Sequence, residues 1–176
     1  MIRIENLMSR AFLIGIIKLV DKNGAQNALE WLREIGKELA EIEGPGFEGA
    51  RENDVNYLPV CPFANTLLDF ITIYGERPSQ FIELVNLSNK QMIEAEDGWE
   101  YPALTTVTGI LHHSYIRRRG ELAGVELLNV GSRCPRTNNV VYNEKALEKA
   151  NMTKEEVDKF LEKGYYVCKI NHLEKE

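Results

Sequence analysis

The feature that most constrains the fold of this chain is one long apolar stretch, AFLIGIIKLV, at residues 11–20. It covers ten residues and contains Lys18, whereas a membrane-spanning helix needs about 20 apolar residues. Glu5 lies where a signal peptide would be basic, and DKN at 21–23 stands where a cleavage site would need small residues. We therefore expect a buried helix in a cytoplasmic protein that makes no contact with a membrane.

Composition narrows the class of protein further. The chain has 176 residues, of which 44% are hydrophobic and 27% charged, as is typical of a folded domain of this length. Its 27 acidic and 21 basic residues give a net charge of −6, which argues against nucleic acid as a partner. Three cysteines form no regular framework, so we expect reduced thiols.

The N-terminal part predicts a helical hairpin. Residues 4–20 are apolar on nearly every side, the turn DKNG follows at 21–24, and a second helix carries its apolar residues on one stripe until Gly-Pro-Gly at 44–46. Because the first helix is apolar nearly all round, we expect part of it to lie in the interface of a homodimer.

The remaining chain mixes helices with short strands. The patterns predict helices from residue 62, near residue 79 and over 102–119, and strands at 55–59, 125–130, 139–142 and 165–170. Asn143 is expected to cap a short helix, and Thr153 with Glu156 to form a capping box. We predict an α+β fold with helices packed on a small antiparallel sheet. Residues 1–142 would form a ligand-binding core and 143–176 a C-terminal helical extension with a strand.

Cys61 is the first candidate for chemistry. It stands just before Pro62, which suits the first position of a helix, so its sulfur would lie among unpaired amide groups at the positive end of the helix dipole. Such surroundings lower the pKa of a thiol and favour the nucleophilic thiolate. The alternative is a buried small apolar residue at a helix start.

A second Cys-Pro pair lies in the loop GSRCPRT at residues 131–137. Cys134 is flanked by Arg133 and Arg136, whose guanidinium groups could stabilise a thiolate or bind an anionic ligand. The alternative is an ordinary hairpin loop with its arginines in water. Cys168 lies in an apparent strand, YYVCKI, and is expected to be structural.

Two of the three histidines, His112 and His113, are adjacent. Neighbours on a helix point about 100° apart, so we expect one of them at most to face a given site. His112 is the better candidate for a buried base, although a core histidine with satisfied hydrogen bonds is the commoner case. A zinc site formed by Cys61, Cys134 and a histidine, His112 or His113, is the metal-binding alternative; otherwise no cofactor is expected.

The segment VNYLPVCPFANTLLDF at 55–70 resembles the core of the L-2-amino-thiazoline-4-carboxylic acid hydrolase-like family. The later segment GVELLNVGSRCPRTNNVVYN is similar to the ending seen there and in the 4-vinyl reductase type of ligand-binding domain. The family's second cysteine, with its following acidic residue, has no counterpart in ELVNLSNKQM. Of the family's cysteines, the resemblance thus carries over to Cys61 and also to Cys134, and it implies a functional role for both.

Together these features predict a protein that binds a small anionic molecule. If it is an enzyme, it would be hydrolase-like and act on a C–N or C–S bond, with Cys61 and His112 as catalytic residues. Cys134, Arg133 and Arg136 would contact the ligand. The alternative is a sensor without catalytic activity, or a zinc-binding module that uses Cys61 and Cys134.

Overall fold

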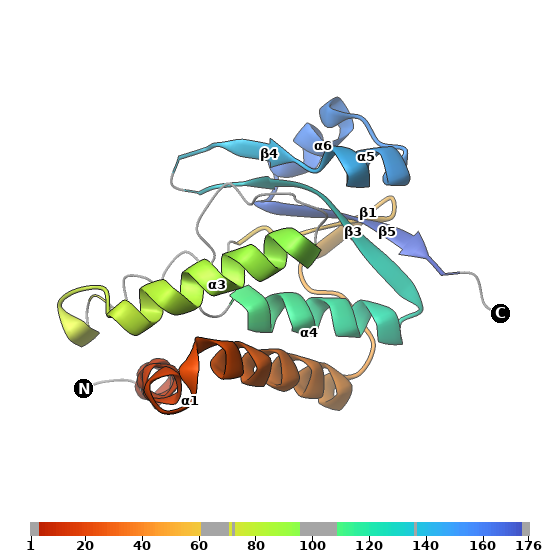
Figure 1. The fold of residues 1–176 in the computed structure, drawn as a ribbon. Helices are drawn as coiled ribbons and strands as arrows, with labels where there is room; N and C mark the ends of the chain where they lie inside the picture. Colours follow the sequence, from red (N-terminus) through yellow and green to blue (C-terminus); the bar gives the residue numbers. More distant parts are fainter. Residues whose placement is uncertain (1–3, 61–70, 72, 96–108, 136, 174–176) are drawn as a thin grey trace.

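The computed structural model of this chain describes residues 4–60, 71, 73–95, 109–135 and 137–173. Helices and a sheet form separate layers, so the predicted α+β class is confirmed (Figure 1). The elements are, in chain order, α1 (Ile4–Glu43), β1 (Ala50–Glu52), β2 (Val55–Tyr57), α3 (Ser79–Ala95), α4 (Gly109–Leu122), β3 (Val125–Arg133), β4 (Val140–Tyr142), α5 (Glu144–Ala150), α6 (Lys154–Leu161) and β5 (Tyr166–His172).

The strands form one antiparallel sheet in the order β1-β2-β5-β3-β4. The residues that we separated as a C-terminal extension thus supply β5, which lies between β2 and β3. In this register Cys168 of β5 pairs with Asn56 of β2 on one side and with Asn129 of β3 on the other. A bulge between Asn129 and Gly131 shifts the register of β3.

Alternating side chains of the sheet face two different helical layers, as the period of two in a strand requires. Cys168 and Ile170 of β5 pack with Tyr115 and Ile116 of α4. Val167, the residue before Cys168, faces the opposite side and packs with residues of α5 and α6. Figure 1 shows α4 below the sheet and α5 with α6 above it. The sheet face toward α4 is the one that carries the candidate site.

The two predicted N-terminal helices are present as the halves of α1, which meet at a break, but they do not form a hairpin. The break falls at Gly24, within the expected turn, where φ is 81° and ψ is 159°. A positive φ suits glycine, which has no Cβ to collide with the backbone. In Figure 1 the first half of α1 is seen nearly end-on while the second half runs across the picture, so the halves are not antiparallel neighbours.

The apolar stretch at 11–20 is largely covered within the chain. Its buried residues pack with the second half of α1, with α3 and with α4, in a cluster that contains Leu13, Ile16, Ile17, Val20, Leu29, Leu32, Leu84 and Ile110. The apolar character of this helix is therefore explained by the fold of one chain, and the homodimer stays a prediction. None of the described helices combines the length and apolar character needed to cross a bilayer.

Candidate functional site

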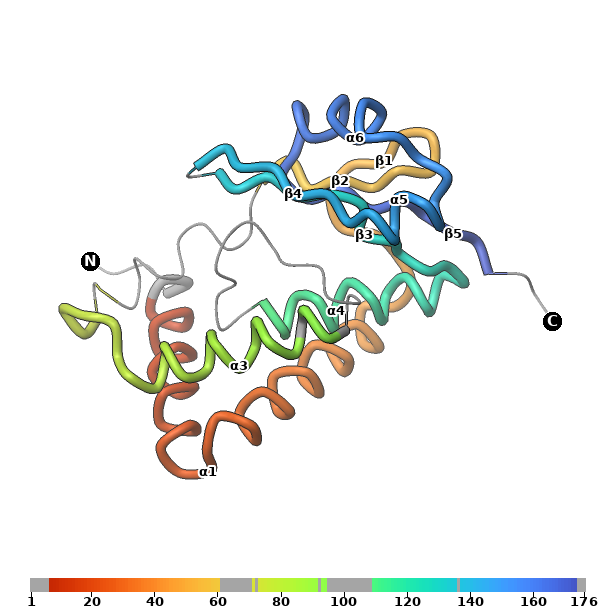
Figure 2. Tube along the Cα trace, turned by 45° about the horizontal axis from the view of Figure 1, so that its top comes forward, coloured from red at the N-terminus to blue at the C-terminus, as the bar shows by residue number. Residues whose placement is uncertain are grey.

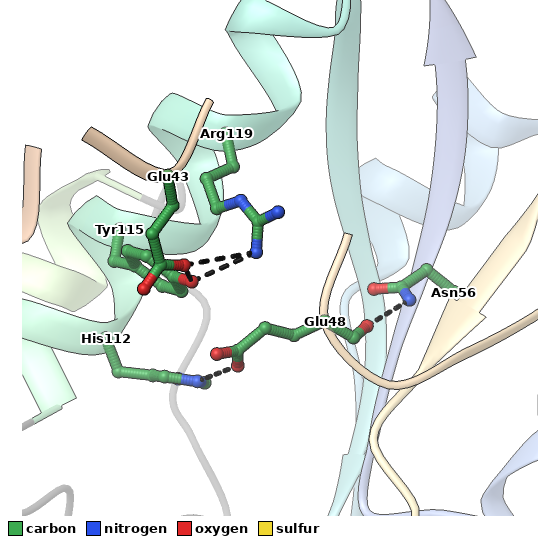
Figure 3. A network of polar contacts seen from close by, with 6 residues as sticks. All are labelled: Glu43, Glu48, Asn56, His112, Tyr115 and Arg119. Atoms are coloured by element: carbon green, nitrogen blue, oxygen red, sulfur yellow. Dashed lines mark hydrogen bonds and ion pairs between the residues drawn. The ribbon is translucent and has the colours of Figure 1, made fainter. Parts of the chain in front are cut away.

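The candidate site forms where the loop at 44–49 meets α4. Glu48, in that loop, places its Oε2 atom 2.5 Å from Nε2 of His112 (Figure 3). His112 is mostly buried, with 16% of its side chain exposed, and Glu48 is about one-third exposed at 35%. This short contact joins residues 64 positions apart in the sequence.

A side chain of the sheet holds the backbone of Glu48 in position. The side chain of Asn56, buried on β2, donates through Nδ2 to the carbonyl oxygen of Glu48 at 2.6 Å and to that of Ala50 at 3.1 Å. The next residue, Gly49, has a φ of 76°, which favours glycine. The carboxylate thus stands on a fixed loop, with little freedom to leave His112.

Arg119 ties the start of the same loop to α4. Its Nε donates to the carbonyl oxygen of Gly44 at 3.0 Å, and its Nη1 lies 3.6 Å from a carboxylate oxygen of Glu43. Nη1 also donates to the hydroxyl oxygen of Tyr115 at 3.0 Å, and that hydroxyl donates to Glu43. Figure 3 shows this group beside the Glu48–His112 pair, so about two turns of α4, from His112 to Arg119, anchor both ends of the loop.

The electrostatics follow from these contacts. The hydrogen bond from His112 lowers the pKa of Glu48 below its ordinary value, more than burial raises it, and the positive charge of Arg119 acts in the same direction. Burial raises the pKa of Tyr115, and its hydrogen bond to Glu43 adds to that shift. At neutral pH the site therefore holds an ionised Glu48 carboxylate facing the imidazole.

His112 lines a small pocket between α4 and the sheet. The pocket has an interior of about 20 Å³, which is room for about one water molecule. Most of the lining is apolar, and its polar members come from α4 and from the middle of the sheet. The lining residues are Leu58, Gly109, His112, His113, Ile116, Arg117, Leu127, Asn129, Tyr166 and Cys168.

The second predicted cluster, around Cys134 and Arg133, lies away from the pocket of His112. Cys134 is buried just beyond β3, where its N–H donates to the carbonyl oxygen of Asn139 and its own oxygen accepts from Asn138, both at 2.9 Å. The guanidinium of Arg133 lies 4.7 Å from the ring centre of Tyr165, and Nη2 donates to the carbonyl oxygen of Gly164 at 3.4 Å. Neither Cys134 nor Arg133 lines the pocket of His112.

Two predicted site residues, Cys61 and Arg136, lie outside the described residues, so their roles stay predictions. Within the described part of the chain, no three His, Cys, Asp or Glu side chains gather as a metal site. Since the expected zinc set includes Cys61, the zinc alternative also stays a prediction.

Sequence reasoning missed two residues of this site. Glu48 fell in a segment interpreted simply as a loop, although a single carboxylate in the glycine-rich stretch GPGFEG is a usable signal. Cys168 is a buried strand residue, as expected, yet it also lines the pocket beside His112. No local pattern marks that position, because it depends on the pairing of β5 with its neighbours.

Comparison of this chain with family models, with curated proteins and with solved structures found no match. The family resemblance drawn from the two Cys-Pro segments stays a prediction.

Proposed function

We propose that this chain is a hydrolase-like protein that binds a small anionic molecule and uses His112, held by Glu48, as a general base. The observation that supports this most directly is the 2.5 Å contact between His112 Nε2 and the Glu48 carboxylate, beside a pocket with room for about one water. A histidine oriented by a carboxylate is the usual arrangement for taking a proton from a nucleophile.

The roles of the two ring nitrogens follow from the contact. Glu48 engages Nε2, so Nδ1 is the nitrogen through which His112 would exchange a proton with water or with a thiol. The carboxylate fixes the orientation of the ring and stabilises the imidazolium that forms when the proton is taken. Cys61 remains the proposed nucleophile if the reaction passes through a covalent intermediate.

The residues that line the pocket indicate which ligand it would bind. Leu58, Ile116 and Leu127 offer apolar contact, while Arg117 adds a positive charge and His112 and His113 add imidazole groups. An organic acid with a compact apolar body matches this combination. The pocket interior is much smaller than the ~300 Å³ of an ordinary ligand site, so the ligand's body would lie at the mouth and only its reacting end, or the attacking water, inside.

L-2-Amino-thiazoline-4-carboxylate, the substrate implied by the resemblance, is a suitable probe. In the expected reaction the oxygen of water bonds to the ring carbon between nitrogen and sulfur, and the carbon–sulfur bond breaks. His112 takes one proton from the water and passes it to the departing sulfur, while the second proton of the water ends on the former ring nitrogen as the new carbonyl forms. The product is N-carbamoylcysteine, whose free thiol can be measured with a thiol reagent while proton NMR follows loss of the ring.

The histidine and carboxylate variants have matched controls. His112→Gln should lower turnover at least ~100-fold, the range usual for loss of a general base. His172 and Asp54 form a second, exposed pair at 3.5 Å, so His172→Gln and Asp54→Asn should leave turnover unchanged. Equal losses for the His112 and His172 variants would contradict the role of His112.

Binding and turnover are measured separately. Saturable NMR shifts on residues of the pocket, without release of thiol, would leave a binding protein and remove the hydrolase-like part of the proposal. If neither saturable shifts nor release of thiol is observed, the proposal that the protein acts on this class of substrate is wrong. Cys61→Ser tests the nucleophile: retained turnover in that variant would favour direct attack by water.

A further inference from the structure

A second concave surface lies on the other side of α4, between that helix and the second half of α1. It is a groove of about 280 Å³, close to the size of ordinary small-ligand sites. Figure 2 shows the two helices side by side, with α3 next to them. The groove is lined by Arg33, Lys37, Gln91, Ile110, His113, Ser114, Arg117, Arg118 and Glu121.

This lining is basic in a chain whose net charge is −6. Three arginines, a lysine and a histidine face a single acidic residue, Glu121. The spacing of the groups explains their convergence. Arg33 and Lys37 are four residues apart and share one face of α1, while His113 and Arg117 have the same spacing on α4.

Two of these cations have no carboxylate partner in the described part of the chain. Arg118 is neutralised, because its guanidinium contacts Glu41 at 2.5 Å and Glu121 at 3.0 Å. Arg33 instead donates to the neutral side-chain oxygen of Gln91, which positions the guanidinium and leaves its charge in place. For Lys37, no carboxylate of the described residues lies within ion-pair distance.

Like charges one helical turn apart repel each other, and an anion bound between Arg33 and Lys37 would relieve that repulsion. Arg33 is partly buried, so its charge is less screened than it would be in open water. We propose that this groove binds the phosphate group of a small molecule, with Arg33 and Lys37 as its principal contacts.

Phosphate suits the groove better than a carboxylate does. The donors reach the space from two helices, and the oxygens of a phosphate point in several directions, whereas those of a carboxylate lie in one plane. His113 and Arg117 line both the groove and the pocket of His112, so the two sites are neighbours. Phosphate binding in the groove does not require the hydrolase-like function.

Titration with inorganic phosphate tests the proposal, followed by amide NMR of the full chain at constant ionic strength. We expect saturable shifts at residues 33–37 and 113–118, and weaker shifts with acetate. Lys37→Gln removes an exposed charge without disturbing the core and should weaken binding about three- to fivefold. Lys22→Gln removes the charge of another exposed lysine of α1, outside the groove lining, and should leave the affinity unchanged.

Arg33→Gln should weaken binding by a similar factor, and the double variant by about tenfold or more. If loss of the contact with Gln91 destabilises the Arg33 variant, the comparison of the Lys37→Gln and Lys22→Gln variants still tests the phosphate site. Equal affinities of the Lys37 and Lys22 variants would overturn the proposal. So would shifts that fail to saturate, or that chloride reproduces at the same ionic strength.

Discussion

Gly36 of α1 packs directly against the backbone of α4 at Leu111. A Cβ atom added at Gly36 would collide with the carbonyl oxygen of Leu111 and lie 3.2 Å from Cβ of Ser114. This close approach fixes the distance between the two helices. Gly36 precedes Lys37 in α1, and Leu111 precedes His112 in α4. The basic groove and the His112 site therefore both depend on this close approach of the helices.

Gly36→Ala should therefore destabilise the chain. The backbone oxygen of Leu111 cannot move aside as a flexible side chain could, so we expect a loss of about 1–3 kcal/mol despite the better helix propensity of alanine. Gly15→Ala is the matched control, because nothing lies within 4 Å of its added Cβ. That variant should gain roughly 0.5–1 kcal/mol. Urea unfolding of both variants measures the difference, and equal effects would contradict the close contact.

Tyr142 should lose its hydroxyl proton only at unusually high pH. Its hydroxyl donates to Asp158, and this hydrogen bond is the main reason that the pKa of Tyr142 is raised to about 12. We expect the carbon-13 signal of its ring to remain that of a neutral phenol at about pH 11. Asp158→Asn removes the negative charge and should bring the pKa back toward 10. An unchanged titration in that variant would show that Asp158 is not the cause.

The parts of the structure that could be predicted from sequence are those governed by neighbouring residues. Asn143 caps α5 through a hydrogen bond from Ala146 N–H, and Thr153 with Glu156 forms the expected capping box. The contact of Glu48 with His112 could not be foreseen in the same way. It depends on how the loop after α1 returns across α4, which no short pattern encodes.

The capping box offers a test of such a local prediction. Thr153 accepts a hydrogen bond from the N–H of Glu156 at 3.2 Å, and the Glu156 carboxylate accepts from the N–H of Thr153 at 2.8 Å. Thr153→Ala should cost about 1 kcal/mol of stability, while Thr153→Ser should keep most of it. Thermal unfolding compares the two variants. A serine variant as unstable as the alanine variant would indicate lost packing instead of a lost cap.

The contact between Glu48 and His112 predicts a stability that depends on acid pH. The pKa of Glu48 is lowered in the folded chain from its ordinary value of 4.5, so the unfolded chain takes up this proton more readily. The stabilisation is complete above pH 4.5 and is lost as the pH falls through the lower pKa of the folded state.

Glu48→Gln should then cost about 1 kcal/mol near neutral pH, a modest value because one-third of the Glu48 side chain is exposed. The difference between wild type and variant should shrink as the pH falls below 4.5. Asp54→Asn is the control, since its contact with His172 is 3.5 Å long and exposed, and it should change stability by less than about 0.5 kcal/mol at any pH. Urea unfolding at a series of pH values measures both. A Glu48 effect that stays constant down to low pH would mean that the ionised carboxylate is not what stabilises the fold.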